Sequence, residues 1–436
     1  MYTPGSSFAQ DDDSLLPQVA SEKPRTRPAA WRSGLRPLSP RRAASRCLDF
    51  MRPSFLRKTT PKPESGQGGP RKEKYSTEYL DGVRGVASFI VFILHWSHIP
   101  YPSVNSGWGY KGNTSVLLLP FVRVIYSGAA MVSVFFVVSG FVLSHRFVQR
   151  MHRREHSELF SGLTSLTFRR AIRLFLPAFA SSTLAFACAC VGVIMVPQKV
   201  DGKPFEHSFT AYLEYLDMES NPWEWTADFS GFYNPQLWSI AVEFRGSIVV
   251  FLMILGLAKT RTLVRLAVET MLMAHSFAHK RWDVALFIAG MLLPELEVLL
   301  QKPASGSRRR LVNMMLIMTL MLGLFLSGYP REPSDQNAGL HVVATHVAAV
   351  FITRPARYLG RISFALYLVH GLGNRTVGKV LLNGCWDYTI SFVVSTTLYF
   401  SIVIWASDMF WRGVDVPATE FARWLERKCA AEEVAR

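Results

Sequence analysis

The chain has 436 residues, of which 49% are hydrophobic and only 18% are charged, with 48 Lys and Arg against 32 Asp and Glu. The length would suffice for two or three soluble domains, but the apolar content excludes disorder for most of the chain. Apolar runs long enough to cross a membrane recur from Val83 onward, so we expect a protein embedded in a lipid bilayer.

The first 78 residues differ from the rest of the chain. They contain 15 Lys and Arg against 8 Asp and Glu, are rich in Pro, Ser and Gly, and show no apolar period. We expect a disordered, basic, cytosolic tail over residues 1–78. We favour this over a nucleic-acid-binding segment, because the tail lacks aromatic interleaving and finger spacing. The first thirty residues lack an apolar h-region, so we expect no cleavable signal peptide.

Ten apolar runs follow the tail and predict an all-α polytopic membrane domain over residues 79–415, with a short cytosolic C-terminal tail over residues 416–436. The expected spans are residues 83–100, 128–147, 171–196, 237–257, 262–278, 283–300, 311–328, 339–352, 359–381 and 388–410. Removing the fifth or the eighth span would reverse the orientation of everything after it.

The distribution of charge supports this alternation, because cytosolic loops are typically rich in Lys and Arg. With both termini in the cytosol, the inside loops hold the basic clusters around Arg150, Arg261, Arg309 and Arg357, whereas the outside loop of residues 199–236 is acidic. The hairpin at residues 280–281 breaks the pattern. Asn113 begins a glycosylation motif in the first outside loop, so we expect a glycoprotein of the endoplasmic reticulum or another endomembrane, with the plasma membrane as the alternative.

Ionisable residues at membrane depth are costly and therefore indicate function. Asp81 and Arg84 open the first span, and His95 follows Arg84 by eleven residues, about three turns and about 16 Å. Arg84 and His95 therefore share one face of this helix, with His98 close to it. A histidine satisfied by hydrogen bonds inside the bundle is the competing interpretation.

Two further spans bring polar residues to the predicted depth of His95. Glu243 lies about 9 Å in from Leu237 on the fourth span, and His370 lies about 14 Å up the ninth. These residues predict a catalytic ring of His95, Glu243 and His370. The alternative for Glu243 is a structural ion pair with Arg245.

A cluster of arginines begins the predicted third span. Arg170 and Arg173 share a face at a spacing of three residues, and guanidinium groups suit phosphate, so we expect this pair to hold a phosphorylated ligand. Arg169 is equally well explained as an anchor at the cytosolic face. Because the chain has no CxxC pair and no HExxH motif, we expect no metal site.

Five segments together resemble the acyltransferase 3 family of multi-pass membrane acyltransferases, which acylate sugars, cell-wall polymers and, in filamentous fungi, secondary metabolites. They are YLDGVRGVASFIVFILHWSH at residues 79–98, FFVVSGFVL at 135–143, FRRAIRLFLP at 168–177, LWSIAVEF at 237–244 and LGRISFALYLVH at 359–370. Many bacterial relatives carry a fused hydrolase-like domain, which we do not expect after the last span here.

The resemblance implies an enzyme that transfers an acyl group, in particular acetyl, from acyl-coenzyme A to a hydroxyl of a carbohydrate or secondary-metabolite acceptor. By position it implies catalytic roles for Arg84, His95 and Glu243, and donor binding by Arg170 and Arg173. Further candidate site residues are Asp81, His98, Ser139, Trp238 and His370.

We expect His95 to be neutral in its buried setting and to act as the general base, and direct transfer is preferred to an acyl-histidine intermediate. A multi-pass transporter that uses buried His, Glu and Arg is the alternative function, although the two halves show no convincing repeat. A membrane-bound O-acyltransferase of the other large superfamily is disfavoured by the DGVRG and SGF segments. The expected partners are the bilayer, the donor and the acceptor.

Overall fold

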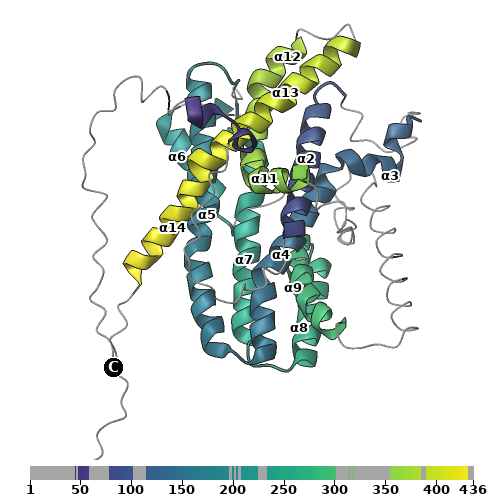
Figure 1. Ribbon diagram of the computed structural model, residues 1–436, viewed down its shortest axis with the longest axis vertical. Coiled ribbons are helices and arrows are strands. Elements are labelled where there is room, and N and C mark those ends of the chain that lie inside the picture. The colour runs from purple at the N-terminus through teal and green to yellow at the C-terminus, as the bar shows by residue number, and fades with distance from the viewer. Residues whose placement is uncertain are drawn as a thin grey trace, which may run out of the picture. The chain divides into compact units, whose positions relative to one another are not determined.

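In the part of the chain that the structure describes, the computed structural model is helical (Figure 1) apart from one short hairpin, in which Lys199–Val200 pairs with Lys203–Pro204. The chain divides into two units, residues 1–52 and 53–436, and the description below concerns the second. The structure describes residues 45, 48–57, 78–101, 114–195, 199–200, 203–204, 208–223, 233–300, 314, 318, 354–383 and 389–430.

Eight long helices coincide with eight of the ten predicted spans. They are α2 (Glu78–Ser97), α4 (Gly128–Arg153), α5 (His156–Cys190), α7 (Trp238–Leu257), α8 (Thr262–Ala278), α9 (Trp282–Leu300), α11 (Arg354–Gly373) and α13 (Thr389–Phe410). The predicted spans at 311–328 and 339–352 fall outside the described residues, except for positions 314 and 318. The prediction of membrane helices is confirmed, whereas the count of ten is not.

Five of the described helices are long and apolar enough to cross a membrane. They start at Tyr79, Gly128, His156, Pro235 and Ser391, and the last runs on to Cys429. The other long helices are either shorter, as α8 is, or carry more charge, as α9 and α11 do. Such helices need protein neighbours to shield their polar groups from lipid.

Shorter elements precede, connect and follow the long helices. They are η1 (Ser54–Leu56), η4 (Val116–Leu118), α3 (Pro120–Arg123), η5 (Val124–Tyr126), α6 (Phe209–Ser220), η6 (Pro235–Leu237), η9 (Asn374–Gly378), α12 (Lys379–Asn383), η10 (Trp411–Asp415) and α14 (Val416–Cys429). Helix α6 starts where the Ser208 hydroxyl accepts a hydrogen bond from the backbone N–H of Ala211, an N-cap that satisfies one of the unpaired N–H groups of the first turn.

Helices α2 and α11 approach each other very closely. A Cβ on Gly85 would lie 2.2 Å from the backbone nitrogen of Gly360, and one on Gly360 would lie 2.0 Å from the carbonyl oxygen of Asp81. Only glycine allows this approach, and it fixes the register of the two helices. They run in the same direction, because His95 further along α2 meets His370 further along α11.

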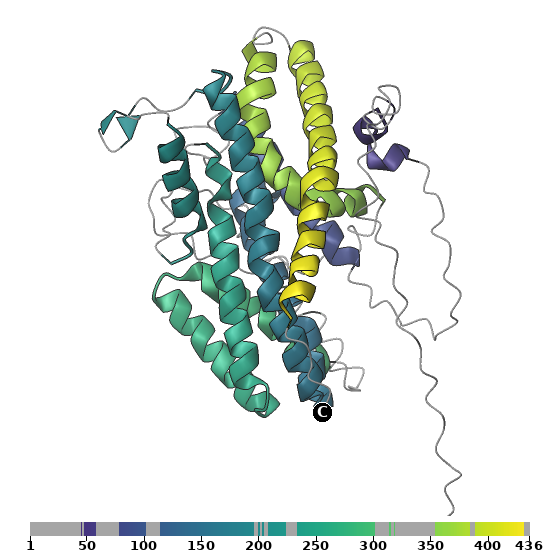
Figure 2. The same cartoon turned by 90° about the vertical axis from the view of Figure 1, so that its left-hand side faces the viewer.

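The apolar core lies between α4, α7 and α9, where Phe136, Phe251 and Phe287 are almost fully buried. A second cluster joins α2, α4, α7 and α11. Figure 2 shows α5 running alongside α7, with the continuous helix of α13 and α14 on its other side. An ion pair of 3.0 Å between Arg169 and Glu426 joins α5 to α14.

Three boundaries differ from those predicted. Helix α5 starts at His156 rather than at residue 171, because the arginines at residues 169–173 mark a change in polarity along the helix and not its beginning. Residues 416–429, predicted as a tail, form α14. Within the tail predicted to be disordered, Ser54–Leu56 forms a 3₁₀ turn that is held by Asp408.

Candidate active site

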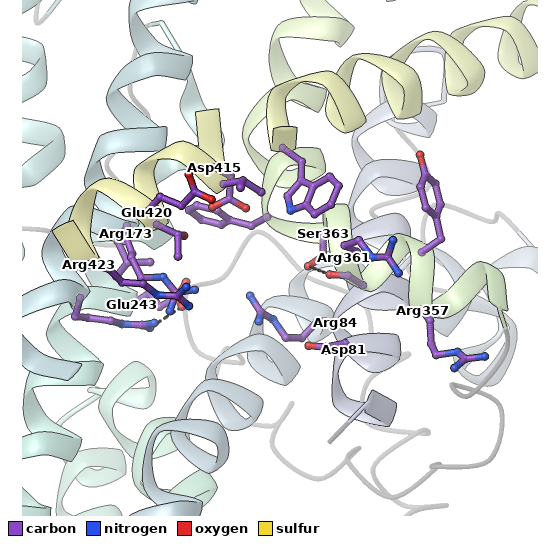
Figure 3. A pocket seen from close by; sticks show the side chains of 18 of the residues that line it. Asp81, Arg84, Arg173, Glu243, Arg357, Arg361, Ser363, Asp415, Glu420 and Arg423 are labelled. Carbon is purple, nitrogen blue, oxygen red and sulfur yellow. Dashed lines mark hydrogen bonds and ion pairs between the residues drawn. The ribbon is translucent and has the colours of Figure 1, made fainter. Parts of the chain in front are cut away.

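A pocket of about 720 Å³ opens where α2, α5, α7, α11 and α14 converge (Figure 3). Six arginines and four carboxylates line it, so its lining carries a formal surplus of two positive charges. The arginines are Arg84, Arg170, Arg173, Arg357, Arg361 and Arg423, and the carboxylates are Asp81, Glu243, Asp415 and Glu420. A concave surface of this kind favours an anionic ligand with more than one charge.

Arg170 on α5 is held by acceptors from α7. Its Nη2 donates to Oε1 of Glu243 over 2.8 Å, and its Nε donates to the Ser247 hydroxyl over 2.9 Å. The Ser139 hydroxyl of α4 donates to the same carboxylate oxygen over 3.3 Å. Glu243 therefore pairs with Arg170 and not with Arg245, the alternative partner considered from the sequence.

Arg173 and Arg84 lie beside this pair. Arg173 follows Arg170 by three residues on α5, so both side chains reach the pocket as the spacing predicted. On α2, the Nε of Arg84 is buried and has no hydrogen-bond partner in the described part of the chain. In Figure 3, Arg84 and Asp81 lie between the group of Arg173 and Glu243 and that of Arg361.

His95 lies outside this pocket, eleven residues beyond Arg84 on α2 and about 16 Å along the helix. Its ring centroid is 5.2 Å from that of His370, and the residue is exposed, whereas the sequence predicted a buried setting. His370 is only 1% exposed, and its Nδ1 lies 3.1 Å from the Leu366 carbonyl oxygen, to which it donates. Nε2 of His370 therefore bears no proton in the neutral ring, and it has no hydrogen-bond partner among the described residues.

The predicted catalytic ring is thus only partly assembled. His95 and His370 meet as predicted, but Glu243 lines the arginine pocket instead. Glu243 pairs with Arg170, and the start of α5 at His156 places Arg170 well inside that helix and not at its end, where the sequence had placed it.

The remaining candidates have other surroundings. His98 lies just beyond the end of α2 and is exposed. Trp238 begins α7 and packs partly buried against the core of α4, α7 and α9. Asn113 lies outside the described residues. No group of three or more His, Cys, Asp or Glu suited to a metal ion occurs in the described ranges.

Several lining residues were not assigned to the site from the sequence. Arg357 was interpreted only as part of a cytosolic basic cluster, and Arg361 fell within the predicted span 359–381 without a role of its own. Glu420 and Arg423 were placed in a tail, although α14 shows the separation of apolar and charged faces typical of a helix that packs on a protein surface. This periodicity could have identified α14 as a packed helix from the sequence.

A second polar cluster lies further along α5. Ser182 donates to Oε2 of Glu219 over 2.8 Å, while Ser181 donates to the Leu368 carbonyl and accepts from Asn234, both over 2.8 Å. Glu219 lies on α6, outside the predicted spans, and is 3% exposed. Burial raises the pKa of its carboxyl to about 8, although the hydrogen bond from Ser182 opposes the shift.

Comparison with known proteins agrees with these features. A family model described as an acyltransferase domain, Acyl_transf_3, matches residues 77–412. The O-acetyltransferase PaAT-1 of Phomopsis amygdali is 25% identical over 467 aligned residues, covering 88% of this chain and 90% of the relative.

Two further fungal relatives have the same level of identity. Acyltransferase clz18 of Cochliobolus lunatus and acyltransferase R4 of Phoma sp. are each 25% identical, covering 82% of this chain and 97% of each relative. No solved structure matches the chain significantly. The chain therefore belongs to the acyltransferase 3 family and is a membrane acyltransferase that transfers groups other than aminoacyl groups.

Proposed function

We propose that this enzyme transfers an acetyl group from acetyl-coenzyme A to a hydroxyl group of a carbohydrate or small-molecule acceptor. One observation carries the proposal: a single helix, α2, links a pocket lined by arginines to an accessible histidine, His95. The fungal relative named as an O-acetyltransferase supports the choice of acetyl and hydroxyl.

The phosphates of the donor bind in the arginine pocket. Guanidinium groups bind phosphate through paired, charge-assisted hydrogen bonds. Because Glu243 and Ser247 already occupy Nη2 and Nε of Arg170, we assign the larger share of phosphate binding to Arg173 and Arg84. Glu243 then serves to hold Arg170 in place, and not to assist His95.

The extended pantetheine arm of coenzyme A spans the distance between the two parts of the site. About 16 Å of α2 separates Arg84 from His95, and this calls for a donor with its reactive thioester at the end of a long, narrow arm. A volume of about 720 Å³ suits a ligand of nucleotide size at the other end of that arm.

His95 acts as the general base. It accepts the proton of the acceptor hydroxyl as the oxygen attacks the carbonyl carbon of the thioester. Collapse of the tetrahedral intermediate breaks the carbon–sulfur bond, and His95 returns the proton to the departing coenzyme A thiolate. His370, with Nδ1 bound to the Leu366 carbonyl, packs against His95 and holds its ring in position.

We place the pocket at the cytosolic face, with both termini in the cytosol, because the basic loops then lie inside. In a eukaryotic host, Asn113 would then be glycosylated and an N-terminal tag would be accessible to protease only from the cytosol. A lumenal N-terminal tag would contradict this orientation.

The function is tested with purified protein and labelled acetyl-coenzyme A, by following transfer of the label and release of the coenzyme A thiol. His95→Gln keeps size and hydrogen-bonding capacity, so activity should fall by a factor on the order of 10² to 10⁴ while donor binding persists. His98→Gln, three residues further on, is the matched control and should cost much less. Near-normal turnover by a His95→Gln protein expressed at the wild-type level would contradict the mechanism.

A further inference from the structure

Two walls of the arginine pocket come from outside the residues that the acyltransferase family model matches. The match covers residues 77–412, whereas Phe55 precedes it and α14 follows it, and both line the pocket. Phe55 is 62% exposed, so packing in the hydrophobic core does not explain its position. An exposed aromatic ring at the edge of a pocket lined by arginines calls for a ligand that is both planar and anionic.

The turn that carries Phe55 is fixed to the membrane domain by Ser54. The backbone N–H of Ser54 donates to Oδ2 of Asp408 over 3.0 Å, and its hydroxyl donates to Oδ1 over 2.5 Å. Asp408 is fully buried near the end of α13 and also pairs with Arg412 over 2.8 Å. Two hydrogen bonds to one buried carboxylate hold the turn in a defined position, and this position places Phe55 in the lining of the pocket.

Aromatic residues from two other helices complete this side of the pocket. The Phe55 ring meets Tyr358 of α11 edge to face, with centroids 5.3 Å apart at 85°. Nearby, Trp411 lines the pocket with the guanidinium of Arg361 6.0 Å from its ring centroid. Aromatic faces stack on nucleobases, and adjacent arginines bind the attached phosphates.

We propose that Phe55, Tyr358 and Trp411 form a subsite for the adenine ring of the acyl donor. The inference rests on the proposed function, because it takes the donor to be an acyl-coenzyme A. The adenosine end lies against these aromatic residues, which come from η1, α11 and η10. Its phosphates lie beside Arg84 and Arg173, and the pantetheine arm points away toward His95. A segment outside the family's domain thereby contributes to recognition of the donor.

The direct test measures binding of adenosine 3′,5′-bisphosphate to the purified full-length protein by calorimetry. Phe55→Ala should weaken binding about tenfold, the usual size of one base stacked on one aromatic ring, whereas Phe55→Trp should retain it. Leu56→Ala is the matched control, because Leu56 belongs to the same turn, is 66% exposed and does not line the pocket. Equal affinity in the Phe55→Ala and Leu56→Ala proteins would overturn the subsite.

A kinetic comparison separates the subsite from the proposed function. Phe55→Ala should raise KM for acetyl-coenzyme A about tenfold and leave KM for acetyl-phosphopantetheine, which lacks adenosine, unchanged. Ser54→Ala should give a smaller effect in the same direction. Equal increases for both donors would overturn the subsite and leave the acyltransferase proposal standing. Binding of the bisphosphate that depends on Phe55, in a protein that cleaves no acyl-coenzyme A, would support the subsite and overturn the proposed function.

Discussion

The arginines of the pocket and those of the α7 to α9 region are the same residue type in opposite situations. Arg265 is 3% exposed and donates to Glu295, to the Thr260 carbonyl and to Thr262, so protein acceptors satisfy its guanidinium. In contrast, Arg84 in the pocket has a buried Nε without a partner among the described residues. A structural arginine therefore differs from one available to a ligand in whether protein acceptors satisfy its guanidinium, and not in how deeply it is buried.

The largest effect on stability should come from replacing Arg265, whose guanidinium is satisfied by protein acceptors. Arg265→Ala leaves Glu295, which is fully buried, without its guanidinium partner, and removing one member of a buried pair typically costs about 3–5 kcal/mol. We expect a marked fall in Tm, measured in detergent, without a specific loss of donor affinity in the protein that remains folded. Arg261→Ala, an exposed residue one turn earlier, is the control. If Tm fell no further in Arg265→Ala than in Arg261→Ala, Arg265 would not be a structural arginine in this sense.

Arg170 is paired with protein acceptors and also lines the pocket, so its replacement should have the next largest effect. Arg170→Ala leaves Glu243 unpaired, at a cost of about 1–3 kcal/mol in stability, and it also weakens donor binding. The double variant Arg170→Ala with Glu243→Gln should recover the Tm but not the donor affinity. If donor affinity recovered as well, the pair would be structural only.

Arg173→Ala should affect binding alone. Losing one charged contact to phosphate should raise KM for acetyl-coenzyme A about tenfold, with kcat changed less and Tm close to wild type. Arg169→Ala is the matched control, because this neighbour pairs with Glu426 of α14. Steady-state kinetics in nanodiscs would decide, and an unchanged KM for Arg173→Ala would make this residue a topological anchor.

The smallest effect should appear at the Glu219 cluster and depend on pH. The folded state raises the pKa of Glu219 to about 8, so between the ordinary value near 4.5 and this value the folded protein holds a proton that the unfolded chain releases. Stability from this group is therefore complete at low pH and is lost as pH rises toward 8. Glu219→Gln should remove this loss, so its Tm relative to wild type should rise by about 1–3 °C from pH 5 to pH 8. A difference in Tm between Glu219→Gln and wild type that stays constant over this pH range would contradict the prediction.

The sequence predicted those parts of the protein that depend on local pattern. Apolar runs located eight helices, and spacing on one helix identified Arg170 and Arg173 as neighbours that share a face. It could not predict that Arg357 and Arg423 reach the same pocket, because that depends on packing between helices distant in sequence. For the same reason it could not predict that Glu243 on α7 pairs with Arg170 of α5 and lines the arginine pocket.

The uninterrupted path from α13 into α14 has a practical consequence for producing the protein. The helix passes through the π-helical turn Trp411–Asp415 without a break, whereas the family match stops at residue 412. A truncation chosen from the family boundary would cut inside this turn and delete the wall that carries Glu420 and Arg423. Shortened versions intended for expression should therefore end after Cys429, where α14 ends.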